Sequence, residues 1–257
     1  MLMALINTNS LLGGGISTDA GLTPAQDRWI VRMQYRHMGM ESAMMDMNTQ
    51  MVPVVLAYGI TPAISVMTRA MYVDRSSNSR MPQKGMNDLF ILSKFRLYRK
   101  NTAKYVLGIA PHIASNVPIG NRDVSPRTWN PVLGLNFSFR PRFFAIDVSS
   151  SYTLVDVSNK TDVSESNKFA INTAFSGQIP LKGNSGKTLS PVLELNYFSE
   201  TSENENGNKP GGLFISPGLA YRIGSFSLEG LLQFPVYQKE TGVEQTERLI
   251  AGVKYMF

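Results

Sequence analysis

The chain contains no cysteine and few charged residues, and its only long uncharged stretches are interrupted by turn-forming residues. Without cysteine, it cannot form disulfides, thiolate nucleophiles or zinc–thiolate sites. Only 17% of its 257 residues are charged, whereas ordinary soluble domains contain about 25%. The hydrophobic share of 43% is ordinary, so apolar residues have not replaced the missing charges. This composition disfavours a coiled coil, a charged disordered chain and a bundle of transmembrane helices.

The net charge of +6 comes from 25 basic and 19 acidic residues, which are scattered along the chain and form no basic run. A nucleic-acid-binding protein would concentrate its Lys and Arg on one segment or face. The charge pattern therefore predicts no nucleic-acid partner.

The longest uncharged stretch, residues 47–68, is long enough for a membrane-spanning helix. However, Pro53, Gly59 and the pair Thr61 and Pro62 interrupt it, and Gly-Ile-Thr-Pro is typical of a turn. Two short strands joined by a tight turn fit this stretch better than a helix.

Residues 1–18 also carry no charge, but Lys and Arg do not precede an apolar core as they would in a secretory signal. Asn7, Asn9 and three successive glycines at 13–15 favour a flexible segment. We therefore interpret residues 1–28 as an N-terminal lead-in or the remnant of a signal peptide, and residues 29–257 as one β domain.

From residue 29 onward, apolar and polar residues alternate, which is the pattern of strands with two different faces. Each segment is close to the roughly 9–11 residues that a tilted strand needs to cross a bilayer. The predicted strands are 29–40, 50–58, 63–74, 88–98, 104–117, 130–139, 143–154, 168–179, 190–198, 213–222, 225–237 and 247–257.

The connections between these strands alternate between short and long along the whole chain. The short ones are residues 59–62, 99–102, 140–142, 181–188 and 223–224, and the long ones are 41–48, 75–87, 119–129, 155–167, 199–212 and 238–246. Short turns at one end and long loops at the other are typical of bacterial outer-membrane barrels. We predict an all-β fold, a transmembrane antiparallel up-and-down β-barrel of about 12 strands. A soluble β-sandwich with uneven loops is the alternative.

Two resemblances support this fold. The alternating apolar strand that ends at Phe257 resembles the C-terminal signal that the bacterial outer-membrane assembly machinery recognises. Residues 21–120 resemble the outer-membrane family named for transport in the meta-pathway of phenol degradation, through TPAQDRWIVRMQY at 23–35, VPVVLAYGITP at 52–62, DLFILSKFRLY at 88–98, and Gly-Ile-Ala-Pro at 108–111 with Pro-Ile-Gly at 118–120. The resemblance implies a location in the outer membrane of a Gram-negative bacterium, among lipid and lipopolysaccharide.

Catalysis is not predicted. Barrel phospholipases, which this chain resembles in strand number, place a His and a Ser two residues apart on one strand face. Here Ala114 stands two residues after His112, and Ser115 points to the opposite side. We therefore expect no catalytic residue and no cofactor.

Methionines crowd the first predicted hairpin beside a histidine. Thioether and imidazole groups are suitable ligands for soft ions such as Cu(I) and Ag(I), although Met also fills gaps in ordinary packing. The candidate metal residues are His37, Met38, Met40, Met44, Met45 and Met47.

The polar strand faces would line the lumen of a membrane barrel. By alternation, the lumen-facing charges are Arg32, Arg36, Arg69, Lys94, Arg96, Asp147, Lys168, Glu194, Arg222, Glu229, Arg248 and Lys254. Nine are positive and three are negative, which predicts an anion-favouring channel for passive movement of small solutes, with aromatic compounds among the candidates. Alternatively, these charges pair with one another and with loop carboxylates such as Asp123 and Glu165. The barrel would then be plugged and have a structural or interaction role.

Overall fold

The computed structural model describes residues 15–41, 46–78, 81–155, 167–181, 186–201, 210–239 and 244–257. Its strands are β1 (Trp29–Glu41), β2 (Asp46–Gly59), β3 (Ile64–Ser77), β4 (Gln83–Met86), β5 (Leu89–Phe95), β6 (Tyr98–Asn101), β7 (Tyr105–Val117), β8 (Val132–Pro141), β9 (Phe144–Thr153), β10 (Lys168–Gly177), β11 (Ile179–Pro180), β12 (Lys187–Glu200), β13 (Gly211–Ile223), β14 (Phe226–Gln238) and β15 (Glu244–Met256). Among the described residues, no helix is long and apolar enough to cross a membrane.

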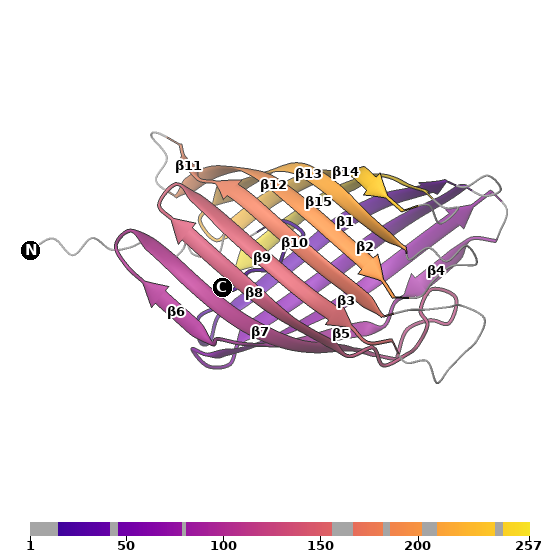
Figure 1. The fold of residues 1–257 in the computed structure, drawn as a ribbon, viewed down its shortest axis with the longest axis horizontal. Coiled ribbons are helices and arrows are strands. Elements are labelled where there is room, and N and C mark those ends of the chain that lie inside the picture. Colours follow the sequence, from indigo (N-terminus) through magenta and orange to yellow (C-terminus); the bar gives the residue numbers. More distant parts are fainter. Residues whose placement is uncertain are drawn as a thin grey trace, which may run out of the picture.

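The strands form one closed antiparallel sheet, seen along its side in Figure 1. Closure comes from the pairing of β1 with β15, and of β10 with β12. The short strands β4, β5 and β6 follow one another between β3 and β7, and β11 continues β10 along β12. With β4–β6 counted as one interrupted strand and β11 as part of β10, the barrel has twelve strands, which confirms the predicted fold class.

The strand ends are where the structure departs from the sequence predictions. Residues 99–102 were expected to form a turn, but Tyr98–Asn101 pair with β7 as β6, and the turn follows them. The chain between β5 and β6 is irregular at 96–97, so the predicted single strand 88–98 is broken there. At the opposite end, β2 begins at Asp46, inside the loop expected over 41–48.

The two faces of the wall differ as the alternation predicted. On β14, Leu228, Leu232 and Phe234 are exposed on the outer face, while Glu229 and Gln233 are buried on the inner face. In a bilayer the outer face contacts lipid, and every strand amide in the wall can pair with a neighbouring strand. The apolar outer residues thus become buried by lipid, and the polar ones are retained inside.

Aromatic rings gather near the ends of the strands where the short turns lie. The rings of Trp29 and Tyr58 are 4.3 Å apart, and those of Tyr255 and Phe257 are 4.7 Å apart. Aromatic side chains of this kind form the interfacial girdles of membrane barrels.

The outer face generates a prediction about depth. Leu135 lies near the middle of β8 and is 47% exposed, whereas Leu97 lies in the irregular stretch between β5 and β6 and is 72% exposed. We expect Leu135→Arg to cost about 2–4 kcal/mol of unfolding free energy in lipid vesicles, and Leu97→Arg about 0–1 kcal/mol. Urea titration read by the gel mobility of folded and unfolded barrel measures both. Equal costs at the two positions would contradict the placement of β8 in the bilayer.

Candidate functional site

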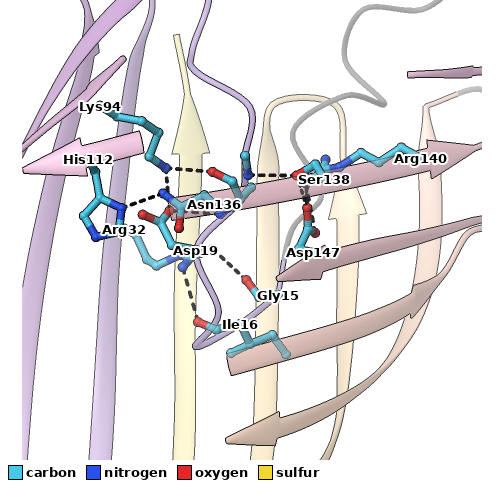
Figure 2. Close-up of polar contacts among 12 residues, drawn as sticks. Gly15, Ile16, Asp19, Arg32, Lys94, His112, Asn136, Ser138, Arg140 and Asp147 are labelled. Atoms are coloured by element: carbon cyan, nitrogen blue, oxygen red, sulfur yellow. Dashed lines mark hydrogen bonds and ion pairs between the residues drawn. The ribbon is translucent and has the colours of Figure 1, made fainter. Parts of the chain in front are cut away.

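Residues 15–28, which we call the strap, precede β1. Residues 15–24 lie inside the barrel, and residues 25–28 are exposed at its short-turn end. At the short-turn end the strap is fixed to the tip of β2: the Asp27 amide donates to the Gly59 carbonyl at 2.9 Å, and the Gly59 amide donates to the Arg28 carbonyl at 3.1 Å. From there its earlier residues contact inward-facing side chains of β5, β8, β12 and β14, as Figure 2 shows in part.

Glycines allow the strap to approach the wall closely. A Cβ atom on Gly21 would lie 2.8 Å from the carbonyl oxygens of Gly108 and Asn136, and one on Gly108 would collide with Leu22. The Gly21 amide donates to the Ser138 hydroxyl at 2.8 Å. Backbone therefore packs directly on backbone here, which larger residues at 21 or 108 would prevent.

An ion pair holds the middle of the strap. The Lys94 ammonium lies 2.9 Å from an Asp19 carboxylate oxygen and donates to the Ala20 carbonyl at 2.8 Å. Burial in the lumen would by itself raise the pKa of Asp19, but the Lys94 charge and hydrogen bond hold that pKa below its ordinary value of 3.8. The ion pair therefore persists at neutral and mildly acidic pH, and protonation of Asp19 below that value weakens it.

Glu194 on β12 binds the first described residues of the strap. Its carboxylate accepts hydrogen bonds from the amides of Ile16 and Ser17, and from the hydroxyls of Ser17 and Thr18. Glu194 is fully buried. A buried carboxylate is costly unless several donors satisfy it, so these donors and Glu194 stabilise one another.

Ile16 provides the apolar part of the same contact. Its side chain is 1% exposed and packs with Val192, Leu231 and Ile250, three inward-facing apolar residues in a mostly polar lumen. Its carbonyl accepts from Gln34 Nε2 at 3.1 Å and from Arg32 Nη1 at 3.2 Å. The strap thus occupies a site that matches it in shape, polarity and charge.

Two further carboxylates of the lumen wall are satisfied in a similar way. Glu229 pairs with Arg32 at 3.2 Å and accepts from Gln34 Nε2 at 2.6 Å. Asp147 pairs with Arg140 at 2.9 Å and accepts from the Ser138 hydroxyl (Figure 2). Glu194, Glu229 and Asp147 are therefore matched by cations or by strap donors, whereas buried Asp88 accepts from the Gly120 amide and keeps one carboxylate oxygen without a partner.

Several cations on the same wall are not matched by carboxylates. Within the part of the chain that the structure describes, the inward-facing cations that form no ion pair include Arg36, Arg69, Arg75, Arg96, Arg248 and Lys254. Two of these stack on aromatic rings instead, Arg69 on Phe90 at 4.5 Å and Arg248 on Phe214 at 4.7 Å. The lumen therefore retains an excess of positive charge.

Of the twelve charged residues predicted to line the lumen, all except Arg96 occupy inward-facing strand positions, and Arg96 lies in the irregular stretch between β5 and β6. Lys94, Glu194 and Arg32 contact the strap directly, and Arg96 donates to the Thr23 hydroxyl at 2.9 Å. Lys168 lies 3.9 Å from Glu200 and over the ring of Phe198, while Arg222 lies 3.4 Å from the Thr188 hydroxyl.

Of the candidate metal residues, His37 lies on the outer strand face, whereas Met38, Met40 and Met47 lie on the inner face. His37 shares the outer strand face with Leu249, whereas Met38 shares the inner face with buried Thr49. Met40 and Met47 pair with each other across β1 and β2, and Met44 and Met45 lie outside the described residues. The described chain contains no group of three or more His, Asp or Glu side chains that could hold a metal ion.

His112 lies inside the barrel, where its Nδ1 atom is 2.9 Å from Asn136 Nδ2. Ser115 donates instead to the Asn116 carbonyl. These contacts give His112 no nucleophilic partner among the described residues.

Four lumen features were absent from the sequence predictions: the strap, Gln34, Arg75 and Arg140. Arg75 and Arg140 were assigned to connections, but β3 and β8 extend far enough to include them. Continuing the alternation two residues past Val73 and Ser138 would have found both arginines. No periodic pattern marks the strap, which is recognisable only by its small residues.

Comparison with known proteins agrees with this architecture. The family described as "Putative MetA-pathway of phenol degradation" matches residues 49–244, more than half of the chain. This confirms the resemblance noted in the sequence. No curated protein matches the chain.

Solved structures with the same fold are bacterial barrels. An outer membrane channel from Pseudomonas putida F1 is similar with a TM-score of 0.71 and 14% identity, covering 96% of this chain and 100% of that one. The beta domain of the Bordetella autotransporter BrkA gives 0.53 and 13%, covering 91% and 100%. A KdgM porin in complex with oligogalacturonate gives 0.51 and 10%, covering 88% and 99%. At these identities the likeness establishes the fold, that of an outer-membrane β-barrel.

The Glu194 contacts predict that the strap can be loosened by one substitution. Because the chain has no cysteine, Ala20→Cys introduces a single thiol whose rate of labelling by a charged thiol reagent reports strap exposure. Adding Glu194→Gln removes the negative charge and one of the two carboxylate oxygens that accept hydrogen bonds from the strap. Labelling should therefore accelerate about tenfold or more.

Glu247→Gln is the matched control, since Glu247 is exposed on the outer strand face. It should leave the labelling rate unchanged. Fast labelling of Ala20→Cys in the otherwise unaltered chain would show that the strap is not docked in the lumen.

Proposed function

The chain belongs to the family described as "Putative MetA-pathway of phenol degradation", and on that basis we propose that it is a passive outer-membrane channel for small anionic solutes. The observation that carries the proposal is the unmatched positive charge on the lumen wall. Solutes move down their own gradient, in either direction, and no residue performs chemistry on them.

Charge selection follows from the way the wall neutralises its carboxylates. Glu194, Glu229 and Asp147 are engaged by the strap, by Arg32 and by Arg140. Cations such as Arg36, Arg69 and Lys254 have no such partner, so their field is not cancelled locally. A lumen of this kind lowers the energy of a passing anion and raises that of a cation.

The strap restricts the path at the level of Glu194. The inward-facing residues Asn136, Ser138, Asp147, Glu194 and Ser216 all have 0% exposure, so water does not reach them while the strap is docked. Its attachments are hydrogen bonds, one ion pair and the apolar side chains of Ile16 and Leu22, which can separate from the wall without unfolding it. Conduction through this section depends on displacement of the strap.

The same burial favours a second candidate function. A barrel whose strap never leaves would be closed, and its long loops would then act in binding at the cell surface. The two functions differ in one property, ionic conductance.

The solute and the assembly route are also part of the proposal. Aromatic side chains in the lumen, Phe90, Phe198 and Phe214, offer apolar surface beside the cations, which suits small aromatic anions. The final strand β15, ending beside Phe257, serves as the signal for outer-membrane assembly.

Reversal potentials in a planar bilayer test the proposal. Under a KCl gradient, the chain should show discrete conductance steps and favour chloride over potassium. Arg69→Glu changes the lumen charge by two units and should reduce or invert this preference.

Lys84→Glu makes the same charge change outside the lumen, where Lys84 pairs with Asp74 at 3.0 Å. In about 1 M salt the screening length is near 3 Å, so this control should leave selectivity unchanged. A folded barrel that inserts but remains silent would favour the closed, surface-binding function.

A further inference from the structure

One row of inward-facing residues near the long-loop end contains polar atoms without partners. Strand pairing places Arg248 of β15, Met38 of β1, Thr49 of β2 and Arg75 of β3 in register. Thr49 is 2% exposed, and its hydroxyl has no hydrogen-bond partner. The Nε atoms of Arg75 and Arg248 are also buried and have no partner. Arg248 donates through another nitrogen, Nη2, to Gln245 Oε1. Buried polar groups are normally satisfied, so the three unpartnered atoms are left for a ligand to satisfy.

Two further arginines lie on the strap side of this row. Arg36 lies two positions before Met38 on β1, and Arg69 lies six positions before Arg75 on β3. Within the described residues, the arginine band formed by Arg36, Arg69, Arg75 and Arg248 makes no ion pair. The four guanidiniums leave the inner surface of β15, β1 and β3 with positive charge that a bound anion would offset.

Apolar groups alternate with these charges. Met38 separates Arg248 from Thr49 in the row, and Met51 pairs with Arg36 across β1 and β2. The rings of Phe90 and Phe214 lie under Arg69 and Arg248. Thioether and aromatic surfaces beside guanidiniums suit a ligand with one anionic end and one apolar end.

The strap lies next to this surface on its short-turn side. Arg36 donates to Gln34 Oε1 at 2.7 Å and 3.1 Å, and Gln34 Nε2 donates to the strap carbonyl of Ile16. A solute that enters from the long loops therefore meets the arginine band before it meets the strap.

We propose that the arginine band and Thr49 form a binding site for a small carboxylate that carries an apolar group. The carboxylate accepts hydrogen bonds from the guanidiniums and the Thr49 hydroxyl, and the apolar group contacts Met38 and Met51. This inference rests on the proposed function, because it identifies the solute class that the channel concentrates.

Binding to the refolded, full-length barrel in detergent tests the site directly. The probe is benzoate, measured by isothermal titration calorimetry, with acetate and benzyl alcohol as comparisons. Benzoate should bind more tightly than either, because acetate lacks the apolar group and benzyl alcohol lacks the charge. Equal binding of benzyl alcohol or of acetate would overturn the proposal.

Three variants locate the site. Arg75→Gln and Arg248→Gln should each weaken benzoate binding about tenfold or more, since each loses charged hydrogen bonds. Thr49→Val should weaken it severalfold with little change in shape. Lys84→Gln, on the outer surface, should leave it unchanged, and heat-modifiable gel mobility confirms that each variant is folded.

The outcomes separate this inference from the proposed function. Anion-selective conductance with no benzoate binding, or with binding that Arg75→Gln and Arg248→Gln do not alter, overturns the site alone. Benzoate binding that depends on the arginine band in a barrel without conductance supports the site and overturns the channel.

Discussion

The requirement that every backbone amide in lipid find a partner determines most of this structure. A sheet can meet that requirement only by closing on itself, and the pairings of β1 with β15 and β10 with β12 do so. Closure makes one strand face lipid-exposed and the other enclosed, which explains why apolar residues lie outside and polar ones inside. The low charge content and ordinary apolar content of the chain follow from this division.

The polar groups enclosed by the barrel then need hydrogen-bond or ion-pair partners of their own. The strap supplies them on one side, because its amides and hydroxyls reach Glu194, while Asp19 reaches Lys94. Within the wall, Arg32 and Arg140 neutralise Glu229 and Asp147. Once the acidic groups are matched, the remaining cations set the sign of the field inside the barrel. In the proposed channel, the same interactions that hold the strap also determine which ions the lumen favours.

Sequence alternation predicted the strands well because one face of each strand contacts lipid and the other faces the lumen. The change of environment from one residue to the next imposes a period of two on the sequence. Alternation failed at strand ends such as 96–102 and 74–77, where both faces become polar and the period disappears. It could not find the strap, whose contacts join residues far apart, as Asp19 and Lys94 are by 75 positions. Only small residues such as Gly15 and Gly21 mark the strap, and they are also typical of a flexible segment.

The arginine band shows a similar limit to what the sequence can predict. Alternation placed Arg36, Arg69 and Arg248 inside, but Arg75 was assigned to a loop, and Met38 was considered for metal binding. The register of β15, β1, β2 and β3 brings Arg248, Met38, Thr49 and Arg75 into one row, with Arg36 and Arg69 on its strap side. Long-range register of this kind depends on how the barrel closes, which no single strand reveals.

The central claim is that a docked strap narrows a positively charged passage. Single-channel recording of a chain that lacks residues 1–27, beside the full-length chain, tests this claim most directly. The account predicts a larger conductance for the shortened chain, with chloride still favoured over potassium. Equal conductance in the two chains, or a preference for potassium once the strap is gone, would contradict it.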